Sequence, residues 1–208
     1  MNAQTQRFSL TGAAGNIECA LDLPADGMVR GIGLVAHPHP LYGGTMDNKV
    51  AQTLARAFVA LGYAAARMNF RGVGESAGVH DAGQGETDDM ALLLDHMAQR
   101  YPDVPVALSG FSFGTFVQAS LQKRLEEQGR PAERLIMVGS AARKWPLPTV
   151  PSNSIVIHGE QDDTITLADA LDWARPQDLP VIVIPGADHF FHRRLHHIKN
   201  LIVEMWHR

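Results

Sequence analysis

Short apolar runs alternate with amphipathic helical patterns along most of this chain. Continuous apolar runs of four to seven residues are typical of strands that are buried on both faces of a sheet. We predict such strands at residues 31–36, 63–69, 104–108, 135–138, 155–158 and 181–184. Strands that alternate with helices predict an α/β fold, with a mostly parallel, doubly wound sheet and helices on both of its faces.

The helices are predicted from apolar residues that recur every three or four positions. They cover residues 50–61, 88–97, 115–125, 167–174 and 195–205. Gly62 stands where the first of these helices would end. Asp88 and Asp89 are expected in the first turn of the second helix, where negative charge is favourable.

The beginning of the chain follows a different pattern, since residues 7–10 and 17–23 read as two strands joined by a glycine-rich turn. We expect an antiparallel hairpin at one edge of the sheet. The chain contains no internal repeat, low-complexity tract or linker, so residues 1–208 are predicted to form a single domain.

Composition narrows the class of function. The formal net charge is −4, and no lysine- and arginine-rich run is present, which argues against a nucleic-acid partner. No apolar stretch approaches the length of a membrane span, and the first eleven residues lack the apolar core of a leader peptide. Cys19 is the only cysteine, which excludes an intrachain disulfide. We therefore expect a cytoplasmic protein, whose oligomeric state the sequence leaves open.

The segment 110–114 has the pattern G-x-S-x-G, between a predicted strand and a predicted helix. In that context the serine stands on a sharp turn, and its hydroxyl is exposed at the carboxyl end of the strand. The pattern alone is also compatible with an ordinary turn. Its position after a buried strand makes Ser112 a candidate nucleophile.

A serine nucleophile needs a base and a group that orients the base. Asp162 follows the strand 155–158, and His189 follows the strand 181–184, so both fall at carboxyl ends of strands. The order serine, aspartate, histidine is the order found in α/β-hydrolases. Asp163 is a rival for the carboxylate, and the rivals for the base are His158 and His192.

Stabilising the developing oxyanion requires two N–H donors. The residue after the nucleophile, Phe113, would supply one, and the loop 37–44 would supply the other. Pro38 has no N–H, and neither has Pro40. The remaining donors in the loop are His39 and Leu41, of which we take Leu41 as the first choice.

Aromatic residues near these loops are candidates for the substrate pocket. We expect Tyr42 and Trp145 to line it, and Phe113 is a further candidate, although aromatic residues beside strands more often belong to the core. The segment 139–153 is short and contains three prolines, which discourage helix formation. It is therefore too short to form a helical lid over the pocket.

Two other motifs are better explained without a ligand. Residues 72–77 fit the G-x-G-x-x-[GA] pattern of dinucleotide sites, but no helical pattern follows directly. His192 and His196 are one helical turn apart, as in some metal sites, but Arg193 and Arg194 between them would repel a cation. Arg71 is expected to pair with a nearby carboxylate.

Taken together, the chain resembles the α/β-hydrolases, specifically the small, lidless, esterase-like bacterial members with the general plan of dienelactone hydrolases. The residues that carry this resemblance lie at 37–44, 69–76, 110–114, 158–162 and 186–191. The resemblance implies hydrolysis of a small acyl substrate by a serine, histidine and aspartate, without a cofactor or metal. A thioesterase, a peptidase or a binding module without turnover would keep the same fold.

Overall fold

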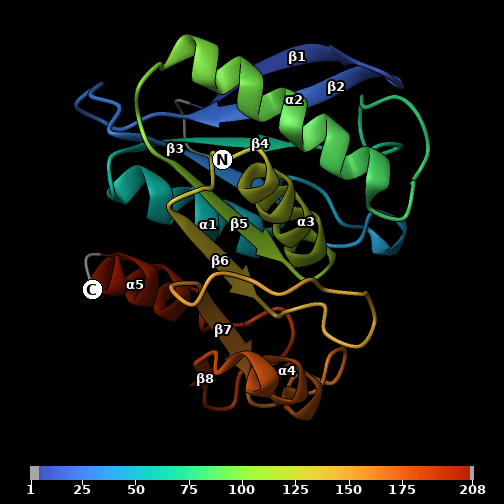
Figure 1. The fold of residues 1–208 in the computed structure, drawn as a ribbon, viewed down its shortest axis with the longest axis vertical. Coiled ribbons are helices and arrows are strands. Elements are labelled where there is room, and N and C mark those ends of the chain that lie inside the picture. The colour runs from blue at the N-terminus through green and yellow to red at the C-terminus, as the bar shows by residue number, and fades with distance from the viewer. Residues whose placement is uncertain (1–4, 207–208) are drawn as a thin grey trace.

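The computed structural model describes residues 5–206, in which eight strands form one sheet (Figure 1). Their order across the sheet is β1-β2-β4-β3-β5-β6-β7-β8. The first two strands form an antiparallel hairpin at the edge, β2 pairs antiparallel with β4, and every later pairing is parallel. The strands are β1 (Gln6–Gly12), β2 (Gly15–Asp22), β3 (Gly31–Ala36), β4 (Tyr63–Met68), β5 (Val106–Phe111), β6 (Arg134–Val138), β7 (Ile155–Gly159) and β8 (Val181–Ile184).

Helices cover both faces of the sheet, as predicted. They are α1 (Lys49–Ala60), α2 (Gln84–Arg100), α3 (Phe113–Glu127), α4 (Leu167–Ala174) and α5 (Leu195–Met205), with short 3-10 helices η1 (Pro40–Tyr42) and η2 (Arg175–Gln177). Figure 1 shows α2 and α3 together in front of the strands. None of the helices within residues 5–206 combines the length and apolar character needed to cross a membrane.

The two apolar cores follow from the alternation of side chains along each strand. In β3, for example, Leu34 packs into the core beneath α2 and α3, and the next residue, Val35, packs into the core beneath α1 and α5. Both side chains are fully buried. This two-sided burial confirms the doubly wound fold and explains why its strands are continuous apolar runs.

The largest difference from the predicted helix boundaries is at the start of α2, while the limits of α1 and α3 differ from the prediction by one or two residues. The helix α2 begins at Gln84, so Asp88 and Asp89 lie in its second turn, and the acidic residue of the first turn is Glu86. The buried carboxylate of Glu86 accepts hydrogen bonds from backbone N–H groups of the preceding loop. Asp89 pairs instead with Arg71, at 2.7 Å, which confirms the expected carboxylate partner of that arginine. Glycines at the start of the helix hid its first turn from the apolar pattern.

Candidate active site

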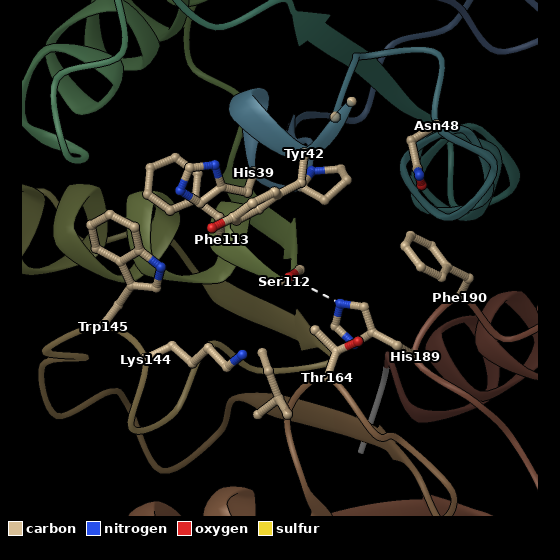
Figure 2. Close-up of a pocket in the computed structure, with 14 residues that line it drawn as sticks. His39, Tyr42, Asn48, Ser112, Phe113, Lys144, Trp145, Thr164, His189 and Phe190 are labelled. Atoms are coloured by element: carbon tan, nitrogen blue, oxygen red, sulfur yellow. Dashed lines mark hydrogen bonds between the residues drawn. The ribbon is translucent and has the colours of Figure 1, made fainter.

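Ser112 lies in the turn between β5 and α3, at the carboxyl end of a central strand. Its φ of 54° and ψ of −123° fall in a region that L-residues rarely adopt. Three hydrogen bonds hold this strained backbone. The Ser112 N–H donates to Val138 O at 3.0 Å, and Ser112 O accepts from the N–H of Thr115 at 2.8 Å and from its Oγ1 at 2.6 Å. The turn directs the serine side chain into a cavity on the protein surface (Figure 2).

The two glycines of the pentapeptide are required by close backbone contacts. A Cβ atom on Gly110 would lie 2.3 Å from Gly114 O, and one on Gly114 would lie 2.4 Å from Ala36 O. Both distances are far inside van der Waals contact, and the obstructing atoms are backbone. Glycine therefore allows the first turn of α3 to approach the end of β3, where the loop 37–44 begins.

Ser112, His189 and Asp162 form a hydrogen-bonded chain. His189 Nε2 lies 3.0 Å from Ser112 Oγ, and His189 Nδ1 lies 2.7 Å from Asp162 Oδ2. A carboxylate only accepts hydrogen bonds, so Nδ1 carries the proton and donates. In the neutral imidazole the lone pair of Nε2 then faces Ser112 and accepts its hydroxyl proton. All three residues are largely buried, with at most 9% of their surface exposed.

Backbone donors fix the aspartate. The Oδ1 atom of Asp162 accepts hydrogen bonds from the N–H groups of Thr164, at 3.0 Å, and Ile165, at 2.8 Å. Its other oxygen is thereby directed at the imidazole. The neighbouring Asp163 is exposed and contacts only the hydroxyl of Thr164, at 3.4 Å. Of the two candidate carboxylates, the structure brings Asp162 to His189.

The rival histidines have other partners. His158 is fully buried, and its Nε2 donates to Ile165 O at 2.9 Å, while burial lowers its pKa. It therefore packs beneath the loop that carries Asp162. His192 is exposed and pairs with Asp188 at 2.6 Å. Only His189 among these three reaches Ser112.

The loop after β3 is anchored by a buried histidine. His37 accepts a hydrogen bond from the N–H of Phe70 at Nε2, at 2.9 Å, and donates from Nδ1 to Pro38 O, at 2.6 Å. Burial lowers the pKa of His37 to about 3, so the imidazole is neutral. Because Pro38 O and the His39 N–H belong to one peptide group, this bond also sets the direction of the His39 N–H.

The loop residues Leu41 and His39 differ in how their N–H groups are used. Leu41 donates its N–H to Nδ1 of His39, at 3.2 Å, and its side chain is 70% exposed, outside the cavity lining. The His39 N–H finds no acceptor among the residues that the structure describes. Phe113 is the first residue of α3, so its N–H lacks an acceptor within the helix. These positions favour His39 over Leu41 as the partner of Phe113 in binding an anionic oxygen.

The cavity at Ser112 has a volume of about 550 Å³ and includes both predicted pocket residues, Tyr42 and Trp145. Tyr42 is 87% exposed at its rim. Trp145 belongs to an aromatic wall, with its ring 4.7 Å from that of Phe113 and 5.6 Å from that of His39. Figure 2 shows this wall on one side of Ser112. On the opposite side lie His189 and Phe190.

Lys144 also lines this cavity, although the sequence did not predict it as a pocket residue. The segment 139–153 has no helix or strand, so periodicity gives no side-chain direction there. Its place next to Trp145 was the only available signal. No aspartate or glutamate is among the described residues that line the cavity.

The sequence also contains a dinucleotide-like motif at residues 72–77 and a pair of histidines, His192 and His196, at the spacing of some metal sites. Residues 72–77 form turns, with Gly72 and Gly74 at positive φ, and the next helix begins only at Gln84. A dinucleotide fingerprint needs a helix that opens at the motif itself. Within residues 5–206 no group of three or more histidine, cysteine, aspartate or glutamate side chains is arranged to hold a metal ion.

Comparison with known proteins identifies relatives of this chain. The family model described as serine aminopeptidase, S33, matches residues 41–157. XC6422 from Xanthomonas campestris, described as an α/β serine hydrolase without a lid, superposes with a TM-score of 0.90 at 31% identity, covering 99% of this chain and 94% of that one. The uncharacterized protein RP471 of Rickettsia prowazekii is 35% identical over 173 residues, which cover 77% of this chain and 71% of that protein.

A further similarity is partial. Lysophosphatidylserine lipase ABHD12 of Danio rerio is 32% identical over 106 residues, which make up 49% of this chain but only 28% of that protein.

Proposed function

We propose that this protein cleaves ester bonds of small acyl substrates. The chain belongs to the hydrolase family described as serine aminopeptidase, S33, and to the α/β-hydrolase superfamily. The observation that carries this proposal is the buried chain of hydrogen bonds from Ser112 through His189 to Asp162. It ends at an open cavity, and the segment 139–153 beside it contains no helix that could form a lid, which suits small acyl substrates.

The mechanism follows from these contacts. Ser112 Oγ attacks the ester carbonyl while its proton passes to Nε2 of His189, and Asp162 stabilises the imidazolium. The oxygen that gains charge is bound by the N–H groups of Phe113 and His39. His189 then donates its proton to the leaving alcohol. In the second half, the same imidazole takes a proton from the water that attacks the acyl-enzyme, and it returns this proton to Ser112 Oγ as the acid leaves.

The charge of the cavity supports an ester substrate over an aminoacyl peptide. An aminopeptidase must bind the free ammonium group of its substrate, which calls for a carboxylate near the scissile bond. Among the described lining residues none is acidic, and Lys144 adds a positive charge. Like charges repel more strongly where water is partly excluded. The family description therefore does not set the substrate of this chain.

The proposal is tested with Ser112→Ala, assayed with 4-nitrophenyl acetate and with a fluorophosphonate probe. We expect loss of both turnover and labelling. Ser152→Ala is the matched control, because Ser152 is exposed and lies outside this cavity, and it should behave as wild type. Labelling that persists in Ser112→Ala would exclude Ser112 as the nucleophile.

The alternatives are separated by a substrate panel. Acyl-CoA thioesters and aminoacyl 4-nitroanilides are compared with 4-nitrophenyl esters at equal enzyme concentration. The proposal expects esters to be cleaved with the highest kcat/KM. A folded wild-type protein that neither turns over any member of the panel nor reacts with the fluorophosphonate would instead be a binding module.

A further inference from the structure

The side chain of Lys144 enters the cavity from the loop between β6 and β7. Figure 2 shows it extending from this loop toward the space between Ser112 and Thr164, with its nitrogen leading. The backbone beneath it is fixed by a tight turn, in which the Lys144 N–H donates to Ala142 O at 2.7 Å and the Trp145 N–H donates to Ala141 O at 3.1 Å. The ammonium group is thus presented to the cavity from a defined position.

The charge of Lys144 is not neutralised by the protein. Among residues 5–206 no carboxylate lies within ion-pair distance of it. Its neighbour Arg143 behaves differently, because its guanidinium pairs with Asp169 at 2.8 Å and does not line the cavity. Two adjacent cations in one loop therefore have different surroundings. One is paired at the surface, and the other has no carboxylate partner among the described residues and lines the same cavity as Ser112.

The rest of the lining adds no opposing charge. The described cavity residues include no aspartate or glutamate, and the wall that contains Trp145, the neighbour of Lys144 in the chain, is aromatic. The Asp162 carboxylate lies behind His189 and is fully buried. A bound ligand would therefore meet one positive charge in partly apolar surroundings, where electrostatic attraction is stronger than in water.

We infer that Lys144 is a specificity-determining residue that selects esters carrying a negatively charged group, such as a carboxylate, a few bonds from the scissile carbonyl. This inference rests on the proposed function, since it concerns substrates of the same cavity. The ammonium would bind the charged group while the ester carbonyl lies at Ser112. Neutral esters of the same length would be cleaved less efficiently.

Pairs of substrates of similar size, one anionic and one neutral, test this inference. Mono(4-nitrophenyl) succinate is compared with 4-nitrophenyl pentanoate, which places the charge on the acyl side. The pair 4-acetoxybenzoate and 4-acetoxybenzamide places it on the leaving alcohol. We expect wild type to prefer the anionic member in at least one pair, and the pair that responds identifies the side of the cavity that Lys144 faces.

The variants isolate the charge from the shape of the side chain. Lys144→Gln is expected to lower kcat/KM for the preferred anionic ester about fivefold or more, mainly through KM, and to leave its neutral partner nearly unchanged. Lys144→Arg should retain the preference, and Lys144→Glu should reverse it. Arg143→Gln is the matched control, because it removes a neighbouring cation that is already paired. Equal effects of Lys144→Gln on both members of each pair, or no preference in wild type, would overturn the inference.

Binding without turnover separates this inference from the proposed function. In Ser112→Ala, calorimetric titration compares succinamate, which is anionic, with succinamide, which is neutral. Binding of succinamate that is lost in the double variant with Lys144→Gln supports the anion site, even if no ester were hydrolysed. Equal binding of both compounds overturns it, even if esters are good substrates.

Discussion

Nδ1 of His37 donates a 2.6 Å hydrogen bond to the carbonyl oxygen of Pro38, and this contact orients the peptide group that carries the His39 N–H. The opposite nitrogen of the ring accepts from the N–H of Phe70. The residue that follows β3 and the second residue after β4 are thereby joined through one neutral imidazole. The loop that faces Ser112 thus takes its direction from a side chain that does not itself line the cavity.

The first prediction concerns this contact. His37→Ala should lower kcat by up to about 10²-fold with a smaller effect on KM, since the His39 N–H would lose its fixed direction toward the developing oxyanion. The measurement is steady-state hydrolysis of 4-nitrophenyl acetate at a temperature where circular dichroism shows the variant folded. An unchanged kcat in the folded variant would show that His37 has no part in positioning this donor.

A second prediction separates two adjacent carboxylates. Asp162→Asn should reduce kcat by about 10⁴-fold, because an amide no longer favours the imidazole tautomer that accepts the Ser112 proton. Asp163→Asn should retain nearly full activity, because that side chain is exposed and does not contact His189. If the two variants lost activity equally, the assignment of the orienting carboxylate would be wrong.

Stability should fall in mild acid. Burial lowers the pKa of His37 to about 3 and also lowers that of His158. In the unfolded chain histidine titrates near its ordinary pKa of about 6.5, so the unfolded state binds protons that the folded state does not. The free energy of unfolding therefore has its full value above about pH 6.5 and decreases as the pH falls toward 3.

This dependence is measured from thermal unfolding midpoints between pH 5 and pH 8, a window above the titration of most carboxylates. His37→Asn, which has no imidazole to protonate, should show a shallower decrease than wild type. A midpoint that stays constant between pH 7 and pH 5 in wild type would contradict the prediction.

A fourth prediction concerns the close approach at the serine turn. Gly114→Ala should lower the free energy of unfolding by about 1–3 kcal/mol and reduce activity, because its Cβ would collide with Ala36 O and displace the turn. Gly27→Ala is a matched comparison: Gly27 has a φ of 71°, but an added Cβ meets no atom within 4 Å. It should be destabilising without loss of activity in the protein that remains folded.

The aromatic wall provides a fifth prediction. Trp145→Ala should raise KM for 4-nitrophenyl hexanoate more than for the acetate, because a longer acyl group can contact the ring and a short one cannot. Tyr42→Ala should have a smaller effect, since Tyr42 is 87% exposed at the rim. Equal KM changes for both esters in Trp145→Ala would exclude the ring from acyl binding.

Much of the fold can be predicted from the sequence, because most strands and helices have the spacing of apolar residues that is typical of their type. The strands 31–36 and 181–184, and the helix 167–174, have the predicted limits. The start of α2 was misplaced, since Glu86 stabilises that helix end through hydrogen bonds rather than through an apolar stripe. A polar cap formed by a loop folding back leaves little trace in hydrophobic periodicity.

The order of residues along the chain is enough to predict that Ser112 stands between a buried strand and a helix, and that Asp162 and His189 follow later strands in a hydrolase-like order. Those facts depend on neighbours along the chain. That Asp162, rather than Asp163, contacts His189 becomes clear from the folded chain alone, because one residue of offset in a turn reverses the direction of a side chain. The fold also places Lys144 in the cavity and pairs the N–H of Leu41 with Nδ1 of His39. Contacts between distant segments, not local propensity, set where these groups point.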